Sequence, residues 1–286
     1  MPSQAVPTVR LRQLGRQLRQ LREDRGMTLD EASAQLERTP SSLSKIETGR
    51  VAVRVRDLRV ILQRYGVQEE QRVNALLALA RDGRKRGWWQ NYGDVLSWAY
   101  QEFISLEADA SAVRSHETIL IPGLLQTEDY ARAVHEAVPP PPGIHRDIDR
   151  LVAVRRERQG VLGRERPLEL WAILDEAAFH RRFGGRKVMR AQLERLLEAS
   201  SMDNVTIQVV PFAAGGHAGI NGPFTILEFP ELVDLDVILV ENLTSGLYLE
   251  DETDIRRYNV VFNHLRMTAL PETDSVALIQ QLARDL

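Results

Sequence analysis

The chain has 286 residues, of which 43% are apolar and none is cysteine. A chain of this length and composition can bury an ordinary core in one large domain or two smaller ones, so intrinsic disorder is not expected. Without cysteine the chain can form neither a disulfide framework nor a thiolate zinc site, which fits a reducing cytoplasm. The start of the sequence lacks the apolar stretch of a secretory signal, and no apolar run approaches the ~20 residues that span a bilayer. We therefore expect a cytoplasmic protein without a membrane segment.

Charge is divided between two parts of the chain. Residues 1–87 hold 18 Lys and Arg against 10 Asp and Glu, whereas residues 88–286 hold 19 against 30. The first part therefore carries a net charge of +8 and the second −11, for a total of −3. A basic segment joined to an acidic one indicates that only the first meets a polyanion such as DNA. The alternative is a chance asymmetry among arginine-rich helices.

The basic part predicts five helices with short connections. Leu14, Leu18 and Leu21 recur at helical spacing with arginine and glutamine between them, which predicts an amphipathic first helix. Thr28 and Glu31 have the spacing of a capping box that opens a short second helix. The expected helices cover about residues 9–25, 28–37, 40–47, 56–65 and 69–81.

The second and third helices are separated by only a few residues. Thr39 and Pro40 restart the helix at once, because threonine caps a helix and proline is tolerated at its first position. Two short helices joined by a tight turn, with small polar residues at the start of the second, form the geometry that places a recognition helix in a major groove.

The segment 25–50, RGMTLDEASAQLERTPSSLSKIETGR, resembles the Cro/phage-repressor (XRE-type) helix-turn-helix family without a gap. The resemblance implies an all-α, lambda-repressor-like DNA-binding domain over residues 9–87. The positions that fit the family pattern are Thr28, Ala32, Leu36, Leu43, Ile46, Glu47 and Gly49.

Roles for individual residues follow from this resemblance. Leu43 and Ile46 would be core positions, and Glu47 would be a structural acid that pairs with Arg22. Leu29 stands where the family often has a glutamine that clamps a phosphate, so that interaction is either missing or supplied by Thr28. The face turned toward base edges or flanking phosphates would be Ser41, Ser42, Ser44 and Lys45, with Thr39, Thr48 and Arg50 contacting the DNA backbone.

We expect modest direct readout from these residues, because hydroxyls read bases loosely, whereas Lys45 can donate to guanine acceptors. DNA shape and phosphate contacts would supply the rest of the specificity. The alternative interpretation of the serines is an ordinary solvated helix start.

The composition changes at Trp88, where we place the boundary of a second domain, residues 88–286. Runs rich in β-branched residues predict strands at 103–110, 113–122, 167–174, 204–212, 222–230 and 236–242. Helices are expected at about 126–137, 145–162, 175–182, 186–200, 251–268 and 273–284. This order predicts an α+β domain around a mixed sheet. The proline run 139–142 is interpreted as a stiff spacer, with a docking site for a proline-binding module as the alternative.

Several stretches of the second part are similar to WhiJ-like regulators of actinobacteria. They include IPGLLQTEDYARA (121–133), RRERQ (155–159) and GGHAGINGPFTILEFP (215–230). The resemblance implies a transcriptional regulator whose C-terminal domain has no known chemistry. It also implies a small partner protein, encoded nearby, that relieves or modulates repression.

Few residues of the second part could carry chemistry. Glu176 and His180 share a helical face, which is half of a metal site that His116 with Glu117, or His217, would have to complete. With six scattered histidines a structural role for them is favoured, and no nucleophile elbow, phosphate loop or dinucleotide fingerprint appears. We therefore expect no enzyme, no catalytic residue, no metal and no cofactor. The glycine-rich segment 215–223 is interpreted as a loop between strands, with a ligand lid as the alternative.

The sequence thus favours a cytoplasmic, nucleoid-associated transcriptional regulator that binds operator DNA. A homodimer is expected because one short recognition helix covers too few base pairs. The second domain would receive a signal. Two alternatives remain open, namely an antitoxin-like component of a two-protein pair and a small-molecule sensor.

Overall fold

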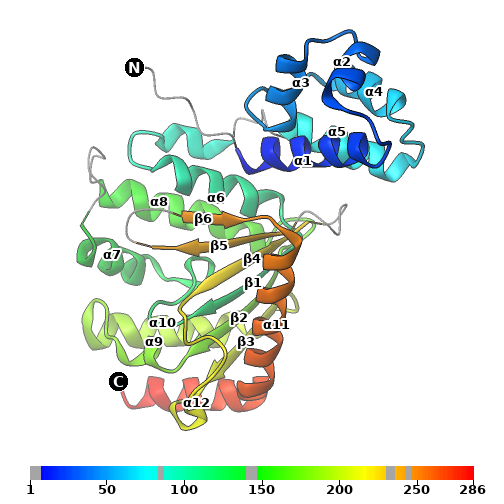
Figure 1. The fold of residues 1–286 in the computed structure, drawn as a ribbon. Coiled ribbons are helices and arrows are strands. Elements are labelled where there is room, and N and C mark those ends of the chain that lie inside the picture. The colour runs from blue at the N-terminus through cyan, green and yellow to red at the C-terminus, as the bar shows by residue number, and fades with distance from the viewer. Residues whose placement is uncertain (1–7, 83–86, 140–146, 230–235, 243–245) are drawn as a thin grey trace. The chain divides into compact units, whose positions relative to one another are not determined.

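The computed structural model describes residues 8–82, 87–139, 147–229, 236–242 and 246–286 (Figure 1). The chain divides between Gly87 and Trp88 into two compact units. That these units act as a DNA-binding domain and a sensor domain stays a prediction. Within the described residues no helix is long and apolar enough to cross a membrane.

The first unit is entirely helical in its described part, as predicted. Thr8, Thr28 and Thr39 each cap a helix with the side-chain oxygen, and Thr28 forms the expected capping box with Glu31. Pro40 occupies the first turn of the third helix, where its missing N–H costs no hydrogen bond. The helices are α1 (Val9–Glu23), α2 (Leu29–Gln35), α3 (Pro40–Glu47), α4 (Val55–Arg64) and α5 (Glu70–Asp82).

The apolar faces of these five helices meet in one core. Leu18, Leu43 and Leu76 are completely buried there and come from α1, α3 and α5. Burial of this kind stabilises by about 1.5–3 kcal/mol for each large side chain, which outweighs the weak helix propensity of such short segments. Tertiary packing therefore holds α2 and α3, which would not be stable as isolated helices.

The second unit is built on a six-stranded mixed sheet, which confirms the α+β prediction. The strands are β1 (Ala112–Glu117), β2 (Glu169–Asp175), β3 (Val205–Val210), β4 (Phe224–Glu228), β5 (Val237–Glu241) and β6 (Gly246–Leu249). Their order in the sheet is β3-β2-β1-β4-β5-β6. The first three strands are parallel to one another, and β4, β5 and β6 continue antiparallel from β1.

Helices cover both faces of this sheet (Figure 1). The face that carries Ile173, Ile226 and Ile238 packs against Phe262 and Leu265 of α11. The crossovers between the parallel strands run through α7, α8 and α10. Because such crossovers are almost always right-handed, these helices lie on the face opposite α11. The helices of this unit are α6 (Trp98–Asp109), α7 (Glu128–Ala137), α8 (Ile148–Gln159), α9 (Ala177–His180), α10 (Gly185–Ala199), α11 (Glu252–Thr268) and α12 (Glu272–Arg284).

The structure corrects one predicted strand. Of the predicted strand 103–110, residues 103–109 lie in α6, because Phe103, Ile104 and Glu107 repeat at helical spacing on a buried face. Ser97 caps the helix through the N–H of Tyr100, at 3.2 Å. The four-residue strand β6 had not been predicted at all. Apart from Pro139, the predicted proline spacer lies outside the described residues.

A buried ion pair joins α6 to α8. Arg158 Nε donates to Glu107 Oε1 at 2.8 Å, and the two side chains are only 4% and 2% exposed. The Arg158 guanidinium also lies over the rings of Tyr100 and Phe103, at 5.3 and 4.8 Å. Because both charges are desolvated, removal of either partner would leave the other charge buried and unpaired and would strongly lower the stability of the fold.

Glu117 ends β1 on the face of the sheet opposite α11. Burial, and to a smaller extent the nearby Glu241, raise the pKa of this carboxyl to about 8, although Arg155 opposes the rise. The folded protein therefore keeps a proton on Glu117 at neutral pH, whereas the unfolded chain releases it at its ordinary pKa of 4.5.

This difference predicts a loss of stability as the pH rises from about 5 to 8, because the folded state binds the extra proton throughout that window. Glu117→Gln should flatten this part of the profile and raise the free energy of unfolding at pH 8 by about 1–3 kcal/mol. Urea denaturation at pH 6 and pH 8 measures both effects. Glu198→Gln, which alters an exposed carboxyl of α10, is the control and should leave the profile unchanged.

Candidate DNA-binding interface

Helix α3 has one face in the core and one face toward solvent. Leu43 and Ile46 are 0% and 4% exposed, which confirms both as core residues. On the other side Ser41 and Lys45 are exposed, while Ser42 and Ser44 are half-buried. Because residues three and four apart share a helix face, Ser41, Ser44, Lys45 and Thr48 form one polar edge.

The backbone of α1 lies directly against the end of α3. A Cβ at Gly15 would approach the Glu47 carbonyl oxygen to 2.5 Å, and one at Gly49 would approach the Arg12 nitrogen to 2.8 Å. Both obstacles are backbone atoms, which cannot move aside as a flexible side chain would. Gly49 also has a φ of +70°, a conformation that glycine adopts without strain. These two glycines therefore set how closely α3 is held.

A buried ion pair fixes the rotation of α3 about its axis. Arg22 of α1 donates from Nε to Glu47 Oε1 at 2.8 Å and from Nη2 to Oε2 at 3.0 Å, which confirms the predicted pair. Arg22 Nη1 donates to the Met27 carbonyl at 2.8 Å, so the guanidinium also holds the chain entering α2. The hydrogen bond that Arg22 donates to Glu47 is the main reason that the pKa of Arg22 rises above its ordinary value. Such a two-pronged contact sets direction as well as distance.

The turn between α2 and α3 contains a strained residue that the sequence did not reveal. Glu37 has a φ of +51°, which is costly for a side chain other than glycine or asparagine. The next residue, Arg38, donates its N–H to the Ser33 carbonyl at 2.9 Å and forms an ion pair with Asp57 of α4 at 3.2 Å. These contacts hold the tight turn. The sequence shows no sign of the left-handed conformation, because position 37 is a glutamate and not a glycine.

The three predicted threonines act as helix caps. Thr28 bonds with Glu31, Thr39 accepts from the Ser42 N–H at 3.2 Å, and Thr48 donates to the Ser44 carbonyl at 2.7 Å. All three are exposed, as is Arg50. The Thr28 hydroxyl would have to exchange the Glu31 carboxylate for a phosphate in order to contact DNA. Contact of these residues and of the α3 edge with DNA stays a prediction.

Comparison with known families identifies both parts of the chain. Residues 13–75 match the model described as a helix-turn-helix domain, and residues 100–281 match the one described as a domain of unknown function, DUF5753. The second match spans more than half of the chain. The chain belongs to the DUF5753 family. Neither a curated protein nor a solved structure matches it. A helix-turn-helix domain ahead of a DUF5753 domain supports the coarse class of a DNA-binding regulator.

In the DUF5753 domain the predicted half of a metal site is formed but is not completed. His180 Nε2 lies 3.2 Å from Glu176 Oε1, so the two do share a face. His116 and His217 lie near each other, with ring centroids 5.7 Å apart. No group of three His, Asp or Glu among the described residues is arranged to hold a metal ion.

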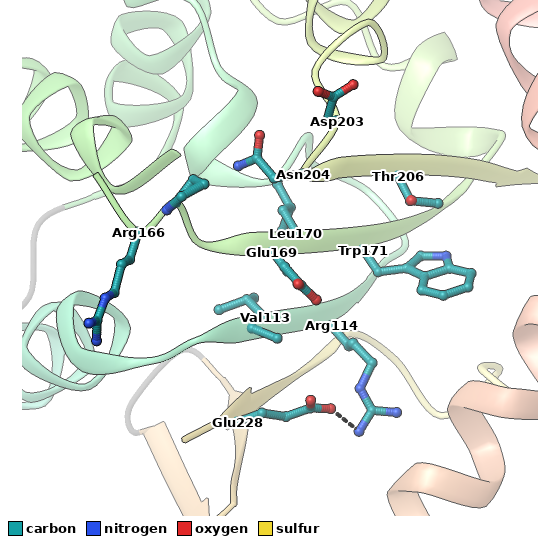
Figure 2. A pocket seen from close by; sticks show the side chains of 12 residues that line it. Val113, Arg114, Arg166, Glu169, Leu170, Trp171, Asp203, Asn204, Thr206 and Glu228 are labelled. Carbon is teal, nitrogen blue, oxygen red and sulfur yellow. Dashed lines mark ion pairs between the residues drawn. The ribbon is translucent and has the colours of Figure 1, made fainter. Parts of the chain in front are cut away.

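The DUF5753 domain also has an open pocket of about 970 Å³ at the amino ends of its three parallel strands (Figure 2). Arg114 and Glu228 form an ion pair on one side, and the Trp171 ring lies nearby. None of these residues was expected from the sequence to line a site. The lining is Ala112, Val113, Arg114, Arg166, Pro167, Glu169, Leu170, Trp171, Asp203, Asn204, Thr206 and Glu228.

Removing one partner of the α1–α3 ion pair should destabilise the first unit strongly. Glu47→Gln leaves the Arg22 charge buried without its carboxylate, so we expect a loss of about 3–5 kcal/mol in the free energy of unfolding. Chemical denaturation followed by circular dichroism measures it. The control is Asp24→Asn, which removes an exposed carboxylate of the same unit that accepts from Gln20. Equal stability of the two variants would contradict the assigned role of Glu47.

Proposed function

We propose that this protein is a sequence-specific transcriptional regulator of the XRE type, related to the WhiJ-like regulators of actinobacteria. The observation that carries the proposal is the polar edge of α3, presented to solvent by an α1–α3 contact that leaves it no freedom to rotate. The net charge of +8 on residues 1–87 supports a polyanionic partner. Cytoplasmic, nucleoid-associated localisation belongs to the same proposal.

The polar edge of α3 and the polar residues around it make different contacts in operator binding. Lys45 reaches acceptors on guanine in the major groove, and Ser41, Ser42 and Ser44 bond to base edges or to flanking phosphates. Thr28, Thr39, Thr48 and Arg50 bind backbone phosphates and so set the register of α3 in the groove. The remaining specificity comes from the shape of the DNA.

A homodimer fits this mode of binding. Helix α3 has eight residues, and a helix of this length reads only a few base pairs. A second copy on a half-site about one helical turn away, some 34 Å, would supply the affinity that one copy lacks.

The DUF5753 domain is proposed to receive the signal and not to act as an enzyme. Its net charge of −11 disfavours DNA as its partner and favours a protein, in line with a small protein encoded nearby. The second candidate is an antitoxin-like pair, in which DNA binding serves autoregulation. A small-molecule sensor is the third.

The operator contacts can be tested by Lys45→Ala with Arg50→Ala. Each of the two substitutions should cost about 1–3 kcal/mol of binding free energy, and the salt dependence should fall by about one unit for each phosphate that is no longer neutralised. Gel-shift titration at several salt concentrations measures both, after genome-wide mapping of bound sites has defined the operator. The melting temperature should stay unchanged, because both side chains are exposed.

The matched control removes the same charge from the other domain, through Lys187→Ala with Arg190→Ala on α10, where both side chains are exposed. Operator affinity of the Lys45 and Arg50 variant equal to that of this control would refute the contact assignment.

The protein partner can be tested by co-expression with the product of the neighbouring small gene. We expect a stable complex on size-exclusion chromatography, together with a change in operator affinity when the partner is added. Separate elution of the two proteins would reject the partner and leave the DNA-binding proposal intact.

A further inference from the structure

Three polar side chains from distant parts of the sequence meet at the carboxyl ends of the parallel strands. They are His116 from β1, Asp175 at the end of β2, and His217 from the glycine-rich loop that follows β3. His217 Nε2 lies 3.4 Å from Asp175 Oδ2, and the imidazoles of His116 and His217 stand edge to face. In sheets with parallel strands, ligands bind at this edge.

The hydrogen bonds of the two histidines determine where their protons lie. His116 Nδ1 is 3.2 Å from the Ile173 carbonyl, which can only accept, so Nδ1 carries the proton and Nε2 a lone pair. His217 Nδ1 accepts from the Gly219 N–H at 3.2 Å, so the proton of His217 is on Nε2 and faces Asp175. Burial lowers the pKa of His116, which keeps it neutral.

Two features of this arrangement are unsatisfied. His116 is completely buried, and its Nε2 has no hydrogen-bond partner among the described residues. The Asp175 side chain is 18% exposed, and in the described part of the chain it pairs with no arginine or lysine. Its Oδ1 accepts from the Ala177 N–H at 2.8 Å, which orients the carboxylate toward His217. The cluster thus holds one negative charge and a buried acceptor, and it lacks a cation that donates hydrogen bonds.

The glycine-rich loop covers this cluster. A Cβ at Gly219 would clash with His116 Nε2, so the loop backbone rests directly on the unsatisfied nitrogen. Gly215 and Gly222 flank the covering segment with φ values of +66° and +112°, and a Cβ at either would meet nothing within 4 Å. Ile220, next to Gly219, is 77% exposed. Ala218 of this segment packs against the core that contains Phe262 and Leu265, so lifting the segment breaks the apolar contacts of one small side chain.

We propose that this cluster is a binding site for a small molecule carrying a primary ammonium group, with the loop of residues 215–222 as its lid. The ammonium replaces Gly219 over His116 and donates to His116 Nε2 and Asp175 Oδ2, while its charge balances the carboxylate. A single metal ion fits less well, because no three of the described groups surround one metal position.

The inference names a ligand for the proposed signal reception by the DUF5753 domain. That the ligand acts as a signal rests on the proposed function, whereas binding of the ligand does not. The full chain is titrated calorimetrically, without DNA, with ethanolamine and with putrescine. Each amine is matched by its neutral diol, ethylene glycol or 1,4-butanediol. We expect saturable binding of at least one amine and none of the diols. Binding of neither amine, or equal binding of a diol, overturns the proposal.

Variants locate the site. Asp175→Asn should weaken the amine about thirtyfold or more, since it removes the carboxylate that balances the ammonium. Asp203→Asn, on an exposed aspartate of the same domain, is the control and should bind normally. Unchanged affinity of Asp175→Asn overturns the proposal. If that variant fails to fold, the histidine-labelled wild-type protein decides, because the amine must shift the His116 Nε2 resonance, and an unmoved resonance overturns the site.

The two levels of the proposal fail separately. An amine that binds at His116 but leaves operator affinity unchanged supports the site and removes its role in signalling. Loss of operator binding in the Lys45 and Arg50 variant has no bearing on the amine titration, which contains no DNA.

Discussion

The ion pair between Arg22 and Glu47 is the constraint on which the rest of the first unit depends. Both charges are buried, so the pair contributes only because its geometry is two-pronged and the remaining donor finds the Met27 carbonyl. Together with the backbone contact at Gly15, it leaves α3 one position and one rotation. A recognition helix needs this rigidity, because an error of an ångström in placement would misdirect hydrogen bonds to base edges.

The second unit obtains its rigidity from the sheet and places its polar groups at the sheet's two ends. The carboxyl ends of the parallel strands bring together His116, Asp175 and His217, and the amino ends open into the pocket beside Arg114. Helices cover the two faces, so chemistry is confined to these ends. This arrangement explains why residues from three distant segments form one cluster while their neighbours along each strand are core.

The two units differ in the kind of change each permits. The described contacts of α3 leave no room for adjustment, since Gly15 and Gly49 tolerate no added atom. The loop over His116 is anchored by His217 at Asp175 and by the packing of Ala218, and it lies between glycines with open space around them. The proposed function needs both properties: a DNA-binding helix held in a fixed position and a ligand-binding loop with two accessible conformations.

The sequence by itself determined the local features of this protein: the threonine caps, the capping box, the helix-turn-helix spacing, the charge division and five of the six strands. These depend on neighbours within a few residues, so one chain is enough to read them. Tertiary structure alone decided that residues 103–109 are helical, that β6 pairs with β5, that Glu37 adopts a left-handed conformation and that His116, Asp175 and His217 converge. Each of these features depends on contacts with segments that are distant in the sequence. The periodicity of apolar residues does not reveal which distant segment packs against a given one.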